Sequence, residues 1–324
     1  MNKVKWGILG TANIARWGMI PGMNQADNCQ LYAIAGRSAE KARRFQEEYG
    51  FEKAYGSYDE LLSDELVQAV YVPLPNDIHC EWVKKALKAG KHVLCEKPLA
   101  MNTAQVTEMF EKARQEGRIL MEAYAYLHSP YVKSLQETIA NGEIGEVDYI
   151  DTAFVTQGYH EDFRLHKEQG GGAMYDLGCY CTTMILSLIE SVPKQVKACA
   201  TFTDLGVDEM TSALITFENQ VSASFHVGMA LGKNTNSRYD RLYIHGSRGS
   251  IRSDVEYNQE GTVSYQVFTE SGIRKKTVEV PNNYALEVEQ LGRCILEGEK
   301  PHISDAFSIR NAQLIDSVFS EITP

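Results

Sequence analysis

The order of hydrophobic and polar positions changes character about 120 residues into the chain. Before that point, short apolar runs alternate with longer stretches in which apolar residues recur every three or four positions. The short runs predict strands and the longer stretches predict amphipathic helices. Such alternation builds a doubly wound parallel sheet with helices on both faces, an α/β architecture. The predicted strands are residues 4–9, 31–35, 69–72, 92–95 and 119–122, and the predicted helices are residues 14–26, 38–49, 79–89 and 102–116.

Local signals at the helix ends support this assignment. Ser38 is expected to cap the second helix, and Pro21 is expected to bend or split the first. The tetrapeptides at residues 57–60 and 102–105 match the capping-box pattern, and each predicts a helix start.

The second part of the chain is rich in strands and has few helices. The sequence predicts an α+β domain with a large, mostly antiparallel sheet, whose helices cover one face only. We place the boundary so that residues 1–123 form the first domain and residues 124–324 form the second. The predicted strands are residues 148–157, 196–203, 210–217, 221–227, 242–245 and 263–268, and the predicted helices are residues 131–141, 173–189, 285–297 and 306–322.

Composition and charge exclude several classes of function. With 32 Lys and Arg against 43 Asp and Glu, the net charge is −11, which disfavours nucleic acid and anionic membranes as partners. No apolar run approaches the ~18 residues that span a bilayer, and the N-terminal run lacks the features of a secretion signal. The seven cysteines form no C-x-x-C pair, so we expect reduced thiols, a cytoplasmic protein and no metal site.

The turn after the first predicted strand matches a dinucleotide-binding fingerprint in part. Gly10 supplies the tight turn, Ala12 stands where a second glycine is usual, and Ala15 is an accepted third residue. A tight strand–helix turn without a ligand is the alternative.

The end of the second strand bears on the choice of cofactor. An NAD site places an acidic residue there, but this chain has Arg37 and Ser38, which suit the 2′-phosphate of NADP. A solvated arginine beside a helix cap is the alternative.

Two further loops follow predicted strands at the same sheet edge. The first carries two prolines together with Asn76 and His79, and the second carries Glu96 and Lys97, followed by Pro98 in a bond that could be cis. An ordinary turn with a helix start, and a surface Glu-Lys-Pro, are the alternatives.

A glycine triplet precedes a helix in the second domain. Asp176 and Tyr180 stand four residues apart on this helix, so they share one face and could handle a proton and a hydroxylated substrate. A capped helix with a core tyrosine is the alternative.

Taken together, these motifs resemble the glucose–fructose oxidoreductase / inositol dehydrogenase / MocA family of NAD(P)-dependent oxidoreductases. The resemblance covers essentially the whole chain and is carried by the ordered motifs at residues 7–15, 36–38, 73–79, 96–98 and 170–180. Tyr180, where many members have histidine, resembles the branch with dimeric dihydrodiol dehydrogenase and NADP-dependent xylose dehydrogenase. The stretch Tyr126–Pro130 departs from the family pattern by lacking an arginine. The resemblance therefore does not define that wall of the pocket or the substrate that it would contact.

The resemblance implies an NADP(H)-dependent oxidoreductase, with NAD(H) possible, that acts on a sugar, cyclitol or dihydrodiol-like polyol as a homodimer. It implies Tyr180 as the acid/base, Lys97 as its helper and Asp176 as the third catalytic residue. The implied substrate contacts are Lys97, Tyr124, His160, Asp176 and Tyr180, with Arg238 as a further candidate for the pocket wall. The implied cofactor contacts are Gly10, Thr11, Ala12, Asn13, Ile14, Arg37, Ser38, Leu74, Pro75, Asn76, His79, Glu96, Lys97, Arg164 and Tyr284, the last with a core role as its alternative.

Two other functions remain open from the sequence. One is a cofactor-bound sensor or regulator without turnover, against which Lys97 and Tyr180 argue. The other is glycoside cleavage through tightly held NAD, against which Arg37 and Ser38 argue.

Overall fold

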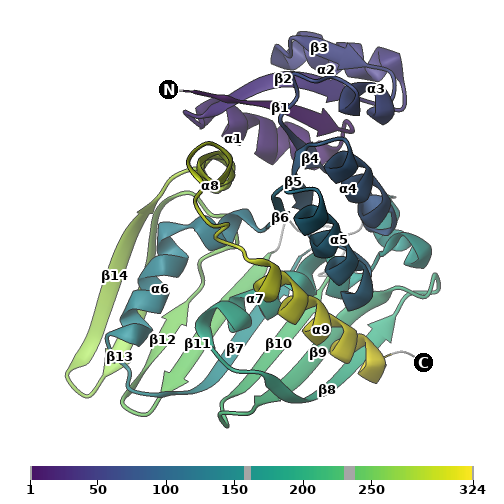
Figure 1. The fold of residues 1–324 in the computed structure, drawn as a ribbon. Coiled ribbons are helices and arrows are strands. Elements are labelled where there is room, and N and C mark those ends of the chain that lie inside the picture. The colour runs from purple at the N-terminus through teal and green to yellow at the C-terminus, as the bar shows by residue number, and fades with distance from the viewer. Residues whose placement is uncertain (1, 157–161, 230–237, 323–324) are drawn as a thin grey trace. The chain divides into compact units, whose positions relative to one another are not determined.

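The chain folds into two compact units, each described here by itself (Figure 1). The computed structural model describes residues 2–156, 162–229 and 238–322. Unit 1 contains Met1–His128 and Asn282–Ile309, and unit 2 contains Ser129–Pro281 and Arg310–Pro324.

Unit 1 is built on a six-stranded parallel sheet, as predicted. Its strand order, β3-β2-β1-β4-β5-β6, reverses direction of growth between β1 and β4, and ligands bind at the carboxyl edge at such a point. The short strand β3 escaped prediction because its three residues carry no apolar run. The strands are β1 (Val4–Leu9), β2 (Cys29–Ala35), β3 (Lys53–Tyr55), β4 (Ala69–Val72), β5 (His92–Glu96) and β6 (Leu120–Ala123).

The helices of unit 1 begin close to the predicted caps. The Lys41 N–H donates to Ser38 Oγ over 3.4 Å, and the Gln105 N–H donates to the Asn102 side chain over 3.0 Å. Pro21 follows a π-helical segment and lies in the first turn of α1, where its missing N–H is tolerated. The segments are η1 (Ala15–Met19), α1 (Ile20–Gln25), α2 (Ala39–Tyr49), α3 (Tyr58–Leu62), η2 (Asn76–Ile78), α4 (His79–Lys88), α5 (Thr103–Gln115), η3 (Ala125–His128) and α8 (Asn283–Glu297).

Helix α8 belongs to unit 1, whereas the sequence analysis placed these residues in the second domain. Two glycines spaced four apart allow the close approach: a Cβ on Gly18 would lie 2.7 Å from the Tyr284 ring, and one on Gly22 would lie 2.5 Å from Tyr284 Cβ. Tyr284 therefore packs against the first helix of its own unit. The predicted division into 1–123 and 124–324 differs from the observed units because this packing is not visible in local patterns.

Unit 2 is built on an eight-stranded sheet with the order β14-β13-β12-β11-β7-β10-β9-β8. All neighbouring pairs are antiparallel except β7 and β10, so the predicted mostly antiparallel sheet is confirmed. The strands are β7 (Val147–Val155), β8 (Pro193–Phe202), β9 (Asp208–Phe217), β10 (Ser222–Gly228), β11 (Tyr239–Gly246), β12 (Gly249–Ser253), β13 (Gly261–Thr269) and β14 (Gly272–Val280).

Strands β12 and β14 were missed in the sequence. Strand β14 forms the edge of the sheet and reads GIRKKTVEV, with charges where a buried strand has apolar residues. Charged edge strands resist pairing with other chains, and this composition hides them from a search for apolar runs.

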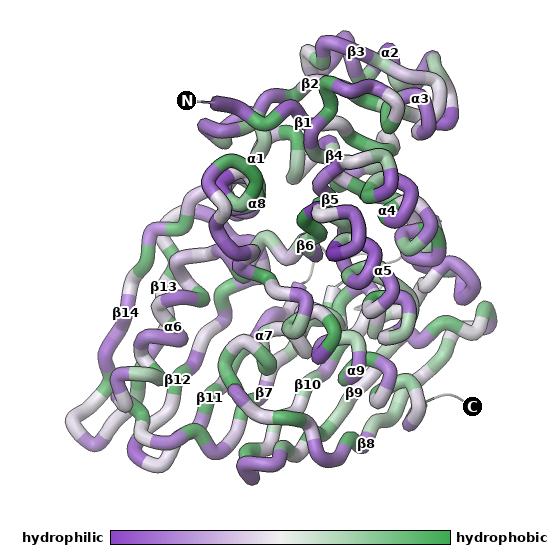
Figure 2. Tube along the Cα trace, viewed as in Figure 1, coloured by the Kyte–Doolittle hydropathy of each residue, from purple (hydrophilic) through white to green (hydrophobic). Residues whose placement is uncertain are grey.

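The helices of unit 2 lie on one face of its sheet (Figure 1). They are α6 (Pro130–Ala140), the π-helical η6 (Met174–Gly178) that continues into α7 (Cys179–Leu188), and the second part of α9 (Asp305–Ile322). On the other face the side chains are more polar: in β10, Ser222, Ser224 and His226 are half-buried and alternate with buried Ala223, Phe225 and Val227. Figure 2 shows this alternation along the strands.

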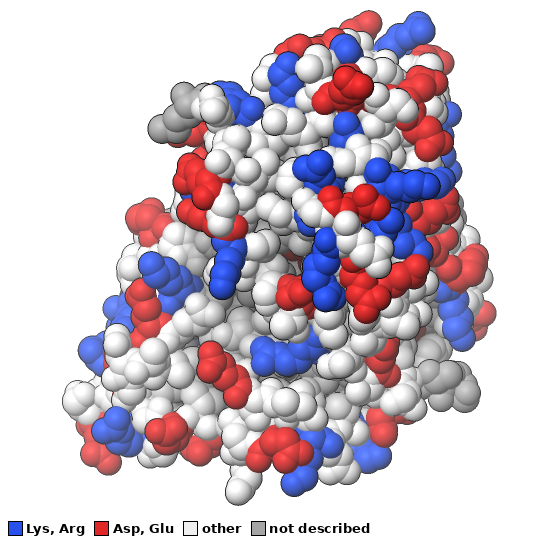
Figure 3. All heavy atoms as spheres, in the orientation of Figure 1, with Lys and Arg blue, Asp and Glu red and all other residues white. Residues whose placement is uncertain are grey.

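On the face that Figure 3 shows, Lys and Arg are interspersed with Asp and Glu. Several ion pairs lie within one helix, such as Lys85 with Glu81 at 2.6 Å. Among the described residues, no helix combines the length and the apolar character that crossing a bilayer requires.

Candidate active site

The turn after β1 requires glycine at its first position. Gly10 has φ +117°, and a Cβ there would lie 3.2 Å from Leu74 Cδ2 and 3.6 Å from the Tyr58 hydroxyl. Half-buried Thr11 and Ala12 lead into the first helical segment, which begins at exposed Asn13. Backbone N–H groups at a helix start suit an anion such as a pyrophosphate.

Arg37 lies exposed at the end of β2, close to Tyr58. Burial raises the pKa of Tyr58, and the positive charge of Arg37 opposes that rise. Ser38 is engaged as the cap of α2. Tyr58 therefore borders both the glycine turn and Arg37. It lies in the short helix α3 (Tyr58–Leu62), where no local motif marks it as a site residue.

His79 joins the two remaining loops at this sheet edge. Its ring is fully buried, with Nε2 2.8 Å from the Leu74 carbonyl oxygen and Nδ1 3.0 Å from the Pro98 carbonyl oxygen. Burial lowers the pKa of the imidazole. Each ring nitrogen faces a loop carbonyl, and the neutral imidazole donates its single N–H to one of the two, so His79 lies between the two loops. The expected contact of His79 with the cofactor stays a prediction.

Lys97 stands in a turn whose backbone is held on both sides. The Lys97–Pro98 peptide bond is cis. The Lys97 N–H donates to Glu96 Oε2 over 3.3 Å, and the Leu99 N–H donates to Glu122 Oε1 over 2.9 Å. Glu96 also accepts a short hydrogen bond from the Tyr71 hydroxyl.

Glu122 is a buried carboxyl group at the end of β6, two residues before Tyr124. Burial raises the pKa of Glu122 to about 7, although hydrogen bonds from the Leu99 N–H and from Tyr124 oppose the rise. Tyr124, expected to contact the substrate, is fully buried, and its ring packs edge-on against Tyr126 at 6.3 Å between centroids.

In unit 2, Asp208 fixes the turn between the glycine triplet and η6. Gly172 has φ +111°, and a Cβ there would overlap Asp208 Oδ1. Asp208 Oδ2 accepts hydrogen bonds from the Met174 N–H and the Thr211 hydroxyl, each over 2.7 Å. Burial raises the pKa of Asp208 to about 6. Asp208 was missed because it lies on β9, more than 30 residues after the helix it caps.

Asp176 is ion-paired within unit 2. Arg164 Nε donates to Asp176 Oδ2 over 2.9 Å, and Arg164 Nη1 donates to Asp162 Oδ2 over 2.7 Å. The side chains of Arg164 and Asp176 are 35% and 18% exposed, so the pair stays open to solvent. Arg164 was expected near the cofactor; within its unit it neutralises Asp176.

Tyr180 lies in a cluster of aromatic rings. Its ring packs edge-on against Phe154 at 5.4 Å and tilted against Tyr257 at 5.2 Å between centroids. Residues 174–178 wind as a π-helix, so the face shared by Asp176 and Tyr180 differs from that of the predicted α-helix. His160, a further candidate for the substrate site, lies outside the described residues.

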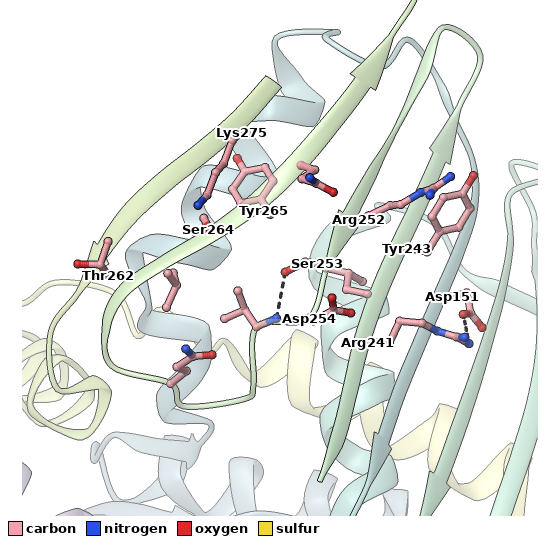
Figure 4. A pocket seen from close by; sticks show the side chains of 15 residues that line it. Asp151, Arg241, Tyr243, Arg252, Ser253, Asp254, Thr262, Ser264, Tyr265 and Lys275 are labelled. Carbon is pink, nitrogen blue, oxygen red and sulfur yellow. Dashed lines mark hydrogen bonds and ion pairs between the residues drawn. The ribbon is translucent and has the colours of Figure 1, made fainter. Parts of the chain in front are cut away.

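A separate hollow lies in the sheet of unit 2 and contains none of the residues above (Figure 4). It has a volume of about 890 Å³. Its walls come from β7, β11, β12, β13 and β14, and Figure 4 shows Arg241 beside Asp151, with which it forms an ion pair. Arg252 lies over the rings of Tyr243 and Phe268.

Comparison with known proteins identifies the family of both units. Residues 4–124 match the model of the oxidoreductase family with an NAD-binding Rossmann fold, and residues 132–252 match the GFO/IDH/MocA C-terminal domain. The chain is 31% identical to D-xylose 1-dehydrogenase (NADP(+)) 2 from Haloferax volcanii, over 97% of this chain and 96% of that protein. It is also 31% identical to trans-1,2-dihydrobenzene-1,2-diol dehydrogenase from Xenopus laevis, over 98% and 96%.

A solved structure shares the whole fold. The crystal structure of KijD10, a 3-ketoreductase from Actinomadura kijaniata in complex with NADP and TDP-benzene, has a TM-score of 0.91 and 30% identity, and covers 99% of this chain and 98% of its own. The ordered motifs, the two sheets and these matches agree, and the chain belongs to the GFO/IDH/MocA family of oxidoreductases.

Proposed function

We propose that this oxidoreductase transfers a hydride between NADP(H) and a CH–OH or C=O carbon of a sugar, cyclitol or dihydrodiol-like polyol. The observation that carries the proposal is the Lys97 turn. Its backbone is fixed by Glu96, Glu122 and His79 at the carboxyl edge of the parallel sheet. A turn held in this way places an ammonium group at the sheet edge where ligands of this fold class bind.

The residues of unit 1 fit the phosphorylated cofactor. The glycine turn accepts no side chain at Gly10, and the N–H groups from Thr11 to Ile14 would hold the pyrophosphate. Arg37, exposed beside Tyr58 and without a neighbouring acid in its turn, would hold the 2′-phosphate. The cofactor supplies the hydride donor and acceptor when it is bound.

The chain's own residues supply the proton chemistry. Tyr180 exchanges the proton with the reacting oxygen, and Lys97 assists by contacting the same oxygen. A free phenol has a pKa near 10. A neighbouring ammonium favours the phenolate and so brings proton exchange within reach of neutral pH. Asp176, held by Arg164, binds substrate or tunes this pair.

The relatives support the substrate class. Their names refer to D-xylose, a dihydrobenzene diol and a keto group, all of which place a hydroxyl or carbonyl at the reacting carbon. Both directions of hydride transfer use the same residues, so the proposal covers oxidation and reduction.

A substrate panel tests this proposal directly. Aldoses, inositols, dihydrodiols and keto-sugars are mixed with the protein and NADP(H) or NAD(H), and the nicotinamide absorbance is followed. We expect turnover with at least one member and a preference for NADP(H). Saturable NADP binding without any turnover would support a sensor instead. Cofactor that survives dialysis, together with release of a sugar from a glycoside, would support the glycosidase alternative.

We also propose that the protein is a cytoplasmic homodimer formed through the open face of the unit 2 sheet. That face lacks covering helices among the described residues and carries exposed Leu214 beside half-buried polar residues. All seven cysteines lie in the described residues and carry free thiols, as expected in a reducing compartment. A light-scattering mass near that of the 36.3 kDa monomer at micromolar concentration would contradict the dimer.

A further inference from the structure

The aromatic cluster around Tyr180 ends at a cation, Arg238. The Arg238 guanidinium carbon lies 4.6 Å from the centroid of the Phe154 ring, which packs edge-on against Tyr180. Arg238 Nη2 also donates to the carbonyl oxygen of Tyr257 over 3.1 Å, and the Tyr257 ring packs against Tyr180 and stacks on Phe154. Arg238 therefore contacts the ring of Phe154 and the backbone of Tyr257, the two residues whose rings pack against the phenol.

Arg238 is itself fixed in place. Its Nε and Nη2 donate to the two carboxylate oxygens of Asp240 over 2.8 and 2.7 Å, and Glu256 lies 3.5 Å from Nη1. The Asp240 side chain is only 1% exposed, and Asp240 Oδ2 also accepts the Tyr257 N–H over 2.8 Å. A two-point contact to a buried carboxylate leaves the guanidinium little freedom to move.

We propose that Arg238 is a positioning residue for Tyr180: it fixes the rings of Phe154 and Tyr257 against the phenol and places a permanent positive charge beside it that favours the phenolate. This proposal rests on the proposed function, in which Tyr180 exchanges the proton with substrate. Lysine could not replace Arg238 fully, because an ammonium lacks the planar fork that holds Asp240 while its face lies on Phe154.

The electrostatic balance at Arg238 agrees with this role. Burial opposes its charge, but Asp240, Glu256 and Tyr180 together raise the pKa of the guanidinium. Because the interaction between two groups is reciprocal, a charge that Tyr180 stabilises on Arg238 also stabilises the phenolate on Tyr180.

Other groups that face Tyr180 within unit 2 set the size of the effect. Asp176 stands one turn earlier on the same helix segment and is neutralised by Arg164. Asp240 and Glu256 carry negative charge behind Arg238 and screen part of its field. The Arg238 side chain is 31% exposed, which weakens the interaction further. We therefore expect a shift of roughly 0.5–1 pH unit in Tyr180 ionisation, below the 1–3 units typical of an unscreened buried pair.

Direct titration of Tyr180 provides the test. The full chain is labelled with [¹³Cζ]tyrosine, NADP is added, and the Tyr180 signal is identified by its loss in Tyr180→Phe. Arg238→Gln removes the charge and keeps a donor for Asp240, so the Tyr180 titration midpoint should rise by roughly 0.5–1 unit. Arg238→Lys keeps the charge and should shift the midpoint by less than half as much. Arg248→Gln is the matched control, since Arg248 donates to the Gly142 carbonyl oxygen in a hairpin turn and contacts no ring of the cluster.

Two safeguards keep the outcome clear. If Arg238→Gln does not fold, the double variant Arg238→Gln with Asp240→Asn leaves no unpaired buried carboxylate and is measured in its place, with the same direction expected. A midpoint that stays at the wild-type value in the folded variant overturns the proposal.

Kinetics separate this proposal from the proposed function. In the oxidation direction, the pH of half-maximal kcat should move with the NMR midpoint in Arg238→Gln and stay in place in Arg248→Gln. If Tyr180→Phe turns over normally while the NMR shift is present, the acid/base role of Tyr180 is wrong and the positioning by Arg238 stands. If Tyr180→Phe loses turnover and the NMR midpoint does not move, Tyr180 keeps its role and the proposal for Arg238 is wrong.

Discussion

In both units, a buried carboxyl group accepts a backbone N–H close to a candidate reactive residue, but the contacts around that residue differ. In unit 1, buried Glu122 accepts the N–H of Leu99, two residues after Lys97. In unit 2, buried Asp208 accepts the N–H of Met174, two residues before Asp176. In each unit, a carboxyl group withdrawn from water fixes the backbone next to a candidate reactive residue.

The two sites differ in the kind of contact that surrounds the reactive residue. The backbone of the Lys97 turn is held by the neighbouring Glu96, by Glu122 on β6 through the Leu99 N–H, and by His79 on α4 through the Pro98 carbonyl oxygen. Tyr180 is surrounded by Phe154 on β7 and by Tyr257 in the β12–β13 connection. Lys97 in unit 1 is therefore positioned by hydrogen bonds to the main chain of its turn. Tyr180 in unit 2 is positioned by packing against side chains from distant elements.

The largest expected effect is a loss of turnover when Tyr180, Lys97 or both are replaced. Tyr180→Phe deletes only the hydroxyl and should lower kcat by about 10²–10⁴. Lys97→Met should cost at least as much, because it removes a contact to the reacting oxygen and the charge that favours the phenolate. If the groups act as one unit, the double variant should be little worse than the worse single variant.

Steady-state kinetics on the four proteins check this expectation, and the NADP dissociation constant of Tyr180→Phe, which should stay near the wild-type value, serves as a control for intact cofactor binding. A double variant whose loss equals the product of the single losses would show that the two residues act independently. Normal turnover in folded Tyr180→Phe would move the proton role to His160 or Asp176.

A substitution in the unit 2 turn should have the next largest effect. Gly172→Ala forces a non-glycine residue into φ +111° and drives its Cβ into Asp208, so both strain and a weakened cap follow. We expect a loss of about 3 kcal/mol or more in the free energy of unfolding. Gly261→Ala is the matched control: it has φ +85° with nothing within 4 Å, and should cost only about 1–2 kcal/mol.

The tryptophans allow the two units to be followed separately. Trp6, Trp17 and Trp82 all lie in unit 1, so their fluorescence in urea reports that unit alone, while far-UV circular dichroism reports both. The Gly172→Ala transition should move to lower urea in circular dichroism and less in fluorescence. An equal cost for the two alanine variants would show that Asp208 does not control this turn.

The contrast between the units also explains what the sequence could predict. The parallel sheet, the helix caps at Ser38 and Asn102, and the motif at Lys97 depend on residues within a few positions of one another, so local patterns located them. The roles of Asp208 and Tyr257 depend on how the strands of unit 2 lie beside one helix, and no local pattern encodes that arrangement. Helix α8 packs in unit 1 because Gly18 and Gly22 leave space that Tyr284 fills. Tyr284 lies more than 260 residues further along the chain, so no local pattern links these positions.

The third prediction concerns stability and pH, where the two buried carboxyl groups should differ. Burial raises the pKa of Glu122 from 4.5 to about 7 and that of Asp208 from 3.8 to about 6. Each folded state therefore binds a proton that the unfolded chain has already lost. Stability should fall as pH rises through roughly 4.5–7 for Glu122 and 3.8–6 for Asp208.

Variants that cannot ionise at these two positions test the pH ranges over which stability should fall. Glu122→Gln keeps an acceptor for the Leu99 N–H and cannot ionise, so its stability relative to wild type should improve between pH 5 and pH 8 by up to about 3 kcal/mol. Asp208→Asn should complete its relative gain by about pH 6. Urea unfolding at several pH values measures both, with Glu111→Gln on the exposed face of α5 as the control. A relative stability of Glu122→Gln that does not change with pH would mean that Glu122 is ionised throughout.

The smallest expected effect concerns the choice between NADP and NAD, which we expect Arg37 in unit 1 to determine. Arg37→Ala removes the cation beside Tyr58 and should weaken NADP binding by roughly 1.5–3 kcal/mol, about 10–100-fold. NAD binding should change little, because NAD lacks the 2′-phosphate that the guanidinium would contact. Arg43→Ala, which removes an exposed arginine from α2 of the same unit, is the matched control and should leave both dissociation constants unchanged. Fluorescence titration with each cofactor measures the difference.

If the binding of NAD and that of NADP weaken equally, Arg37 supports the fold of the β2–α2 turn and does not contact the 2′-phosphate. If Arg238→Gln in unit 2 weakens NADP as much as Arg37→Ala does, the preference for NADP does not depend on Arg37 alone.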